Sequence, residues 1–196
     1  MSCVCNGIFL RGGISIGDWF CEGNILISSA LLEAYDIERA ISVYPIITIS
    51  KEAFSFFNKH PHRDCYGKDI DPIKSLFRKY KTESGKFYYS LDYLRIGYDG
   101  AADWYTNDDC IRYRSERNDE KKNTILRESY MKNQKHYLLG HKNAILKSIK
   151  EFKDDNVLSK YLWLTRYHNT LVREIDPYFS ETKIKQKEIE KCLISR

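Results

Sequence analysis

Side chains that could contact a phosphate group or a metal ion gather near the start of the sequence. Arg11 precedes two glycines, Ser15 follows them, and Glu33 and Asp36 come after the next turn. An arginine at the start of a strand could reach a phosphate, and two acids on one helix could hold a cation. A surface salt bridge and a solvated helix face would use the same residue types. The pattern favours this second interpretation.

Another group of ligand-type residues is the segment H-P-H-R-D-C, with His60, His62, Asp64 and Cys65. Alternating histidines can chelate a metal, but Pro61 stiffens the segment and no complementary ligand pair is identifiable elsewhere in the sequence. We therefore expect a polar loop. The six cysteines lack C-x-x-C pairs and zinc-type histidine spacing, which predicts reduced thiols.

Two further histidines, His141 and His168, lie on otherwise apolar helical faces without an adjacent nucleophile. We expect them to be packed and hydrogen-bonded rather than catalytic. The dense aromatic set could stack nucleic-acid bases, but it more often fills a core or an oligomer contact. This set comprises Phe87, Tyr88, Tyr89, Tyr93, Tyr98, Trp104 and Tyr105.

The first third of the sequence predicts a strand, a tight connection and a helix. Apolar and β-branched residues with glycine punctuation predict a strand over 7–17 and a turn over 21–24. A helix follows from Ser29, capped by Ser28 or Ser29. Residues 43–49 predict a second strand with Pro45 at an edge or irregularity, and 51–58 predict a short helix.

The remainder of the sequence predicts a linker and then mainly helix. Residues 87–94 fit either a strand or an aromatic helix turn, because periodicity alone does not separate the two. The other expected elements are a loop over 59–85 with a short helix over 73–81, a polar stretch over 97–109, helices over 123–152 and from 157 to Asp176-Pro177, and a charged helix or frayed tail from Glu181.

Composition narrows the class of protein. The chain has 196 residues, 42% of them hydrophobic, and a formal charge of +5. It can bury an ordinary core, and no apolar run approaches the ~20 residues of a bilayer span, so we expect a cytoplasmic protein without a membrane partner. Basic residues are mixed with acidic ones over 112–136, so nucleic acid is not the expected partner; an RNA-contacting protein is the weaker alternative.

Three segments carry a resemblance to a known family. These are L-R-G-G-I-S-I-G (10–17), S-A-L-L-E-A-Y-D-I-E (29–38) and Y-P-I-I (44–47), and S-K-Y-L-W-L-T-R-Y-H-N (159–169) is similar to a helical extension of the same group. Together they resemble the bacterial branch of the class III nucleotide cyclases, which includes adenylate, guanylate and the pyrimidine cyclases of anti-phage defence.

The resemblance implies a fold, a reaction and a site. Members of the family have a ferredoxin-like sandwich and pair head to tail, with a nucleoside triphosphate at the shared interface. Two acidic residues hold two Mg²⁺ or Mn²⁺ ions, which promote formation of a cyclic nucleotide and release of pyrophosphate. In this chain the resemblance would give nucleotide contacts to Arg11, Ser15, Glu33 and Asp36.

The sequence also departs from the family pattern. The metal-binding acids of the family precede the R-G-G-I strand, and only six residues precede Gly7 here. The usual glycine, asparagine and arginine of the helix correspond to Ser28, Leu32 and Asp36, which do not supply the same donors. We therefore expect the C-terminal part of a cyclase-like fold, from a truncated frame, a split gene or domain loss, that binds no metal of its own and is inactive alone.

The sequence thus predicts an α+β protein: a partial ferredoxin-like cyclase sandwich with a small antiparallel sheet, followed by a helical C-terminal extension. We expect a strand-helix-strand core over 1–58, a linker and aromatic segment over 59–122, and the extension over 123–196. The alternative function is a non-catalytic binding or assembly module. It would form a homodimer or pair with a full-length cyclase-like chain, because missing strands would leave an open sheet edge.

Overall fold

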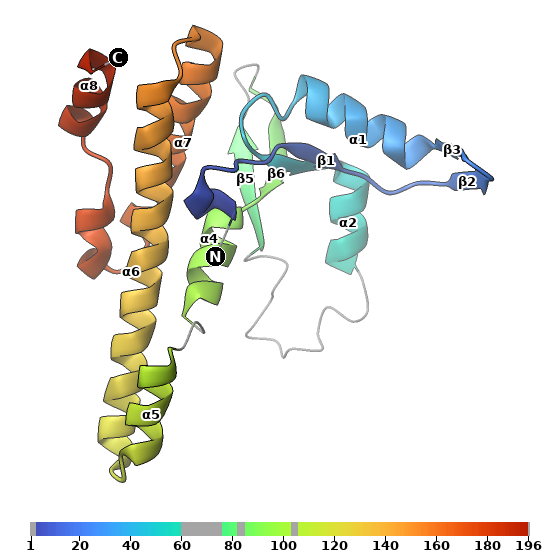
Figure 1. Ribbon diagram of the computed structural model, residues 1–196. Coiled ribbons are helices and arrows are strands. Elements are labelled where there is room, and N and C mark those ends of the chain that lie inside the picture. Colours follow the sequence, from blue (N-terminus) through green and yellow to red (C-terminus); the bar gives the residue numbers. More distant parts are fainter. Residues whose placement is uncertain (1–2, 60–75, 82–84, 103–105, 196) are drawn as a thin grey trace. The chain divides into compact units, whose positions relative to one another are not determined.

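The computed structural model describes residues 3–59, 76–81, 85–102 and 106–195. The protein is mixed α+β and divides into two compact units (Figure 1). The sheet unit is Phe9–Tyr93, and the helical unit combines Met1–Ile8 with Leu94–Arg196. The expected cluster at His60, His62, Asp64 and Cys65 lies outside the described residues.

The sheet unit contains a four-stranded sheet in the order β1-β4-β6-β5. The strands are β1 (Gly12–Ile14), β4 (Ile47–Ile49), β5 (Phe77–Lys81) and β6 (Phe87–Leu91). β1 and β4 are parallel, whereas β6 is antiparallel to both of its neighbours. The expectation of an antiparallel sheet was therefore wrong for β1 and β4. The helix between them returns the chain to the end of the sheet at which β1 begins, so that β4 runs parallel to β1.

Helix α1 (Ser29–Ala40) is that crossover, and it packs closely on β1. Ser28 caps it by accepting a hydrogen bond from the Leu31 amide at 3.2 Å, which confirms the expected start. A Cβ atom on Gly13 would lie 2.1 Å from the carbonyl oxygen of Ala34. The glycine is therefore required by the approach of the helix backbone to the strand, and this contact fixes where α1 lies on the sheet.

Two helices in the described part of the sheet unit cover opposite faces of the sheet. Strand register places Gly13 and Thr48 on the face toward α1, and Ile49 and Tyr89 on the other face. Helix α2 (Lys51–Lys59), close to the expected 51–58, packs on that second face, where Phe54 stacks on Tyr89 at a centroid distance of 3.8 Å. Both faces of the sheet are therefore covered by helix.

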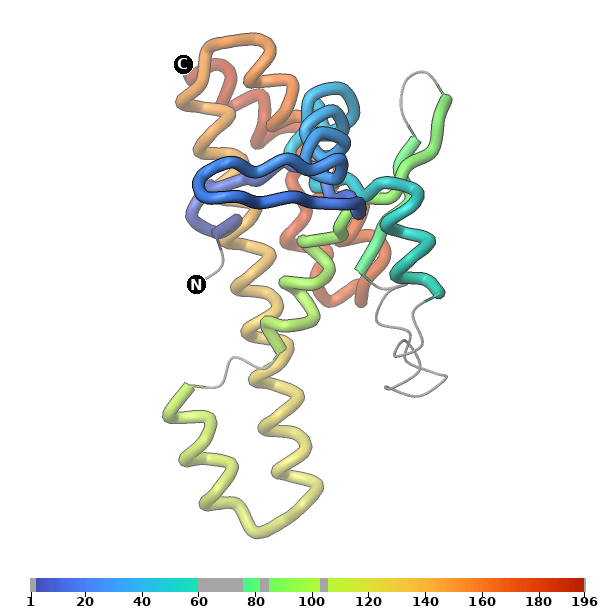
Figure 2. The backbone as a smooth tube through the Cα atoms, turned by 90° about the vertical axis from the view of Figure 1, so that its right-hand side faces the viewer, coloured from blue at the N-terminus to red at the C-terminus, as the bar shows by residue number. Residues whose placement is uncertain are grey.

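Between β1 and α1 the chain forms a hairpin that the sequence did not predict. β2 (Trp19–Glu22) and β3 (Ile25–Ser28) pair with each other as a separate two-stranded sheet, and Figure 2 shows them running out and back. The expected strand over 7–17 shortens to β1, and the expected turn over 21–24 shortens to Gly23-Asn24. Gly23, the first residue of the two-residue turn, has φ +58°, and Asn24 does not have positive φ, since no described non-glycine residue does. A positive φ at the first turn residue alone is typical of a type II′ turn.

Other expectations are also settled by the described strands. The second strand begins at Ile47, after Pro45, and the aromatic segment is strand β6 rather than a helix turn. The short helix expected over 73–81 was wrong from Phe77 onward, because those residues pair with β6 as β5. Successive side chains of a strand point to opposite faces of the sheet. In β5, which lies at the sheet edge, one face therefore carries Phe77, Lys79 and Lys81, and the other carries Arg78 and Tyr80.

The helical unit is built around one long helix. Its elements are the 3₁₀ turn η1 (Cys3–Asn6), α4 (Tyr93–Ala101), α5 (Asn107–Ser115), α6 (Asp119–Glu151), α7 (Asp155–Glu174), the 3₁₀ turn η3 (Pro177–Thr182) and α8 (Gln186–Ile194). α6 contacts α5, α7, α8, η1 and η3. The polar stretch expected over 97–109 contains the end of α4 and the start of α5, where the Thr106 and Asp109 capping box begins the helix.

The core of the helical unit is apolar and close-packed. Its largest fully buried apolar side chains are Tyr137, Phe179, Leu94, Leu138, Ile145, Ile149, Leu164 and Leu171. Tyr98 of α4 meets Phe179 edge to face at 5.5 Å. Asn169 of α7 holds the following segment by donating to the Ile184 carbonyl at 2.9 Å and accepting from the Ile184 amide at 2.8 Å. The chain after α7 is thus fixed to the bundle by side-chain to backbone hydrogen bonds.

Substitution of Gly13 tests the helix-strand contact directly. We expect Gly13→Ala to lower the free energy of unfolding by about 1–3 kcal/mol, because the added methyl group would overlap backbone that cannot move aside. Gly12→Ala is the matched control, since a Cβ there meets nothing within 4 Å. Urea unfolding followed by circular dichroism measures both variants. Equal effects of the two substitutions would contradict the proposed contact.

Candidate functional site

The residues predicted to contact nucleotide lie on β1, the segment after it and α1. Arg11 forms an ion pair with Glu38, and the Ser15 hydroxyl donates a hydrogen bond to a carboxylate oxygen of Glu33. Asp36 lies exposed on α1. The structure therefore brings Ser15 and Glu33 together, but it joins Arg11 to a residue that the sequence analysis did not select.

The electrostatics of this region do not favour a triphosphate. Glu38 offsets the charge of Arg11, and exposed Asp36 would repel phosphate oxygens. Within the described residues, no group of three or more histidine, cysteine or acidic side chains is arranged to hold a metal ion. The arrangement is that of a helix held to a strand by an ion pair and a hydrogen bond.

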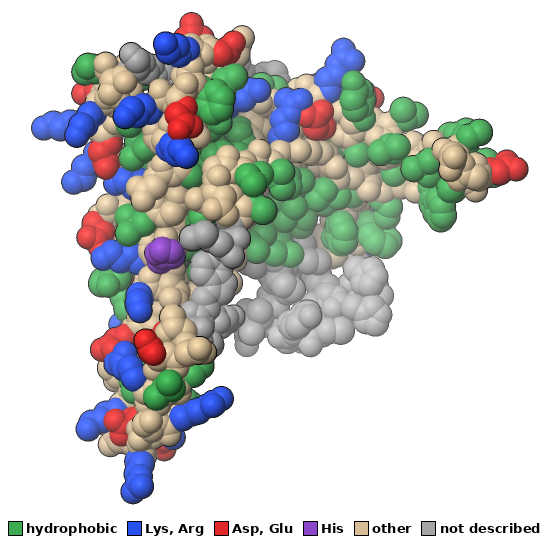
Figure 3. All heavy atoms as spheres, in the orientation of Figure 1, with side chains coloured by type: hydrophobic (Ala, Val, Ile, Leu, Met, Phe, Trp, Pro, Cys, Tyr) green, Lys and Arg blue, Asp and Glu red, His purple; other side chains and the backbone are tan. Residues whose placement is uncertain are grey.

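The most unusual feature of the sheet unit is its exposed apolar surface. Trp19 is 73% exposed, Leu32 67% and Ile27 62%. Figure 3 shows hydrophobic side chains gathered at the β2 and β3 end of the view, with an acidic side chain at the tip. We call this the apolar surface and define it by eight residues: Trp19, Phe20, Ile25, Leu26, Ile27, Leu31, Leu32 and Tyr35.

The hairpin is apolar on both of its faces. Directly paired residues share a face, so Cys21 and Leu26 lie on one side with Trp19, while Phe20 and Ile27 lie on the other. Four apolar side chains of the hairpin are more than half exposed in addition to Trp19: Phe20, Ile25, Leu26 and Ile27. A hairpin in water is marginally stable, and here neither face is covered by its own unit. Such a hairpin needs further apolar contacts on both sides.

A second exposed apolar area lies on α1 next to the hairpin. Leu31 and Tyr35 are four residues apart and share a helix face, with Leu32 beside them. All three are more than half exposed. α1 also contacts β3 within the sheet unit. The hairpin and this face of α1 are therefore neighbours within the sheet unit.

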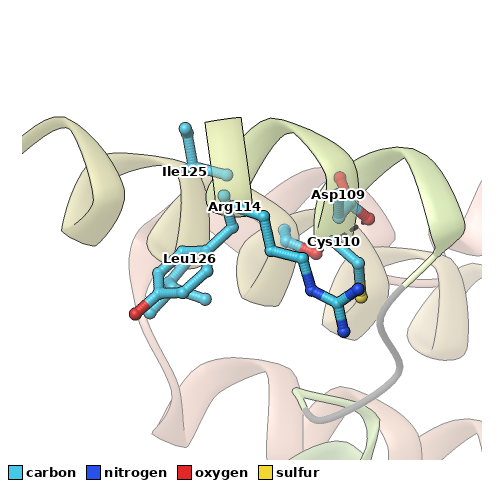
Figure 4. Close-up of a pocket in the computed structure, with 7 residues that line it drawn as sticks. Asp109, Cys110, Arg114, Ile125 and Leu126 are labelled. Carbon is cyan, nitrogen blue, oxygen red and sulfur yellow. Dashed lines mark hydrogen bonds between the residues drawn. The ribbon is translucent and has the colours of Figure 1, made fainter. Parts of the chain in front are cut away.

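The helical unit contains a cleft of about 410 Å³ between α5 and α6. Figure 4 shows Arg114 reaching along α5 toward Cys110, with Ile125 and Leu126 of α6 on the facing wall. Asp109 is part of the helix cap: it accepts from the Thr106 hydroxyl at 2.6 Å and the Ser129 hydroxyl at 3.1 Å. The hydrogen bond from Thr106 lowers the pKa of Asp109, so this carboxylate stays ionised and structural.

His141 and His168 form a buried pair between α6 and α7. Their Nδ1 atoms lie 2.9 Å apart, and His168 Nε2 lies 3.0 Å from the carbonyl oxygen of Thr182. A carbonyl only accepts, so His168 Nε2 donates the proton, His168 Nδ1 accepts and His141 Nδ1 donates. The expectation of packed, hydrogen-bonded histidines is confirmed, and the tautomers of both rings follow from one carbonyl.

Burial keeps both histidines neutral in the folded protein near pH 7. Burial lowers the pKa of His168 to about 4, with Lys142 contributing in the same direction, and burial together with His168 lowers the pKa of His141 well below its ordinary value. Lys142 donates to the Lys183 carbonyl at 3.0 Å and to Glu188 at 2.9 Å. The polar interior of the helical unit thus joins α6, α7 and the segment before α8.

Compared with protein-family models, with curated proteins and with solved structures, the chain gives no significant match. Among the described helices, none is both long and apolar enough to cross a membrane. The apolar surface is the feature of the sheet unit that a folded, isolated chain does not explain.

The buried histidine pair makes stability depend on pH. In the unfolded chain the histidines bind protons near pH 6.5, whereas in the folded protein the buried pair binds them only at lower pH. The free energy of unfolding therefore has its full histidine contribution above pH 6.5 and loses it as the pH falls toward about 4. We expect each histidine to contribute a slope of up to about 1.4 kcal/mol per pH unit in this window.

Comparison with His141→Asn isolates this contribution from that of the carboxylates. Asparagine can donate near the position of Nδ1 but does not titrate, so the variant should show a shallower fall in stability between pH 6.5 and 4.5. Urea unfolding at several pH values measures it. Parallel pH profiles for the variant and the original protein would contradict the neutral buried pair.

Proposed function

We propose that this chain is a non-catalytic binding module that assembles with another protein chain through the apolar surface. The observation that carries the proposal is the eight large apolar side chains on the hairpin and α1, all more than half exposed. The hairpin strands contain a single charged residue, Glu22. A surface that is apolar, contiguous and nearly free of charge at its centre has the composition of an interface core.

The size of the apolar surface supports the same proposal. A large apolar residue presents roughly 150–250 Å² when fully exposed, so the eight residues together expose about 900 Å². Monomeric proteins rarely expose contiguous apolar patches of more than a few hundred Å². A protein interface of standard size buries about 800 Å² on each partner. The apolar surface alone reaches that area.

The charges beside the apolar surface favour a protein partner over an anionic one. The exposed residues Asp18, Glu22 and Asp36 are acidic, whereas Arg39 lies at the far end of α1 and Arg11 is paired with Glu38. Nucleic acid and anionic lipid surfaces attract clustered basic residues and are repelled by acidic ones. A protein chain with apolar side chains is the complementary partner.

Cyclic nucleotide formation is the second candidate, because the sequence resembles the class III cyclases. We propose that the chain does not carry out this reaction alone and that the resemblance reflects a related scaffold used for assembly, with a cyclase-like chain as one kind of partner. The proposal is supported by the ion pair of Arg11 with Glu38 and by the hydrogen bond of Ser15 with Glu33, which engage three of the side chains that a nucleotide would need.

Position-specific photo-crosslinking tests the binding proposal. A photoreactive phenylalanine at position 27 should form protein adducts in the cells that express the chain, because Ile27 lies at the centre of the apolar surface. The matched control is the same residue at position 111, since Ile111 of α5 is also 62% exposed but lies outside that surface. Adducts at neither position, or equally at both, would contradict a dedicated interface.

A direct assay tests the absence of catalysis. Purified protein incubated with ATP, GTP, CTP and UTP in the presence of Mn²⁺ should give no cyclic monophosphate by mass spectrometry. A complete class III cyclase assayed in parallel shows that the conditions support the reaction. Turnover that is lost in an Arg11→Ala variant would show that the chain is an enzyme and overturn the non-catalytic assignment.

A further inference from the structure

The cleft between α5 and α6 is a second candidate binding site, and it lies wholly within the helical unit. Its volume of about 410 Å³ falls within the roughly 300–1,000 Å³ of small-molecule pockets. Side chains of packed helices normally interdigitate and leave few voids larger than a water molecule. A hollow of this size between two neighbouring helices is therefore a feature that could hold a ligand.

The contacts that join α5 to α6 beside the cleft are polar. The Ser129 hydroxyl donates to Asp109 at 3.1 Å, and Arg112 forms an ion pair with Glu128 at 3.4 Å. These contacts hold the two helices together without filling the space between them. Apolar atoms of the cleft wall consequently face water, and a ligand with an apolar body would gain free energy by covering them.

The wall of the cleft on α6 is apolar. Ile125 and Leu126 both line it and are half-buried, so each keeps part of its side chain open to the cleft. Cys110 and Tyr113 of α5 line the cleft as well. A pocket with mainly apolar walls and few polar groups is typical of sites for small organic molecules, in which the polar groups fix the orientation of the ligand.

Arg114 gives the cleft its cationic group. Figure 4 shows the side chain extended along α5 toward Cys110, at the side of the cleft that faces Ile125 and Leu126. Arg114 is exposed, and no described residue forms an ion pair or a hydrogen bond with its guanidinium. A guanidinium in this position can bind a carboxylate through two parallel hydrogen bonds.

The acid that lines the cleft does not cancel this charge. Asp109 accepts hydrogen bonds from Thr106 and Ser129 in the helix cap, and the nearby Lys132 offsets its charge. Arg114 therefore leaves the cleft with a net positive charge. The complementary ligand is an anion whose remaining atoms are apolar.

A second hollow beside the same helices shows the contrast. It has a volume of about 430 Å³ and also includes Ile125, but Arg112 and Glu128, which line it, already form an ion pair with each other. A charged ligand would have to displace that contact. The cleft that contains Arg114 is therefore the better site for an anion.

We propose that the cleft between α5 and α6 binds a small organic acid, with the carboxylate held by Arg114 and the apolar body against Ile125 and Leu126. This site is separate from the apolar surface and does not depend on the proposed function. The volume suits a molecule of one or two fused rings, or a short aliphatic chain of similar size.

Alkylation of Cys110 in the purified full chain tests the proposal, with 2-naphthoate as the probe. For a ligand of about 13 non-hydrogen atoms we expect a dissociation constant of about 1 mM or lower. At about 10 mM, 2-naphthoate should slow the reaction of Cys110 with N-ethylmaleimide at least about 10-fold, because the bound ring covers the thiol. Mass spectrometry of peptides measures the rate at each cysteine. Cys3 and Cys21, both exposed outside the cleft, should react at unchanged rates.

Substitution of Arg114 tests the role of its charge. Arg114→Gln should raise the dissociation constant of 2-naphthoate at least about 10-fold, because the charge-assisted hydrogen bonds are lost. Neutral 2-naphthol should bind this variant and the original protein equally. Arg127→Gln is the matched control, since Arg127 is exposed on α6 but does not line the cleft, and it should leave the affinity for 2-naphthoate unchanged.

Three results would overturn the proposal. They are an unchanged rate at Cys110 with about 10 mM 2-naphthoate, equal protection in Arg114→Gln, and protection of Cys21 in place of Cys110, which would put the probe on the apolar surface. The crosslinking at position 27 is a separate measurement on the sheet unit. Failure of the cleft proposal therefore leaves the binding function standing, and failure of that function leaves the cleft proposal standing.

Discussion

Apolar side chains on both faces of a two-stranded hairpin place a strong constraint on this protein. Two strands alone bury little, and the hairpin of residues 19–28 exposes Trp19, Phe20, Ile25, Leu26 and Ile27 to solvent. The free energy of leaving that surface in water is of the same order as the stability of a small domain. The hairpin is thus an element whose stability depends on another surface.

The rest of the sheet unit determines where the hairpin and α1 are presented. Gly13 allows α1 to approach β1 at backbone distance, and the Arg11 ion pair with Glu38 joins the end of the helix to the start of the strand. Because α1 is held on the β1 and β4 face, its remaining side, with Leu31 and Tyr35, stays available next to the hairpin. The residues that resemble a nucleotide site serve, in this geometry, to position the apolar surface.

The sequence predicted the helices better than the strands, and the reason is physical. α1, α2 and α7 have capping residues or a clear apolar period, such as Ser28 and Asp154 at their N-caps. β5 was taken for helix because strand pairing with β6, a tertiary interaction, decides its conformation. The parallel pairing of β1 with β4 likewise depends on the path of α1 rather than on the residues of either strand.

The apolar surface was missed although the sequence contains a signal for it. Two apolar runs separated by Gly23-Asn24 indicate a hairpin, but the expected turn over 21–24 included the end of the first run and left the second run without a strand. Exposure of both faces could not be predicted, because an apolar strand is ordinarily buried. Of the predicted nucleotide contacts, Ser15 and Glu33 do meet, whereas the pairing of Arg11 with Glu38 depends on how α1 lies across β1.

Backbone hydrogen exchange over 19–28 tests the central claim most directly. Amides of an uncovered two-stranded hairpin open readily, so they exchange fast unless another chain covers them. The account predicts that exchange in this segment slows when the proteins of the host cell are present, while exchange in α6 does not change. Exchange that is equally fast with and without the proteins of the host cell would show that nothing binds the apolar surface and would contradict the account.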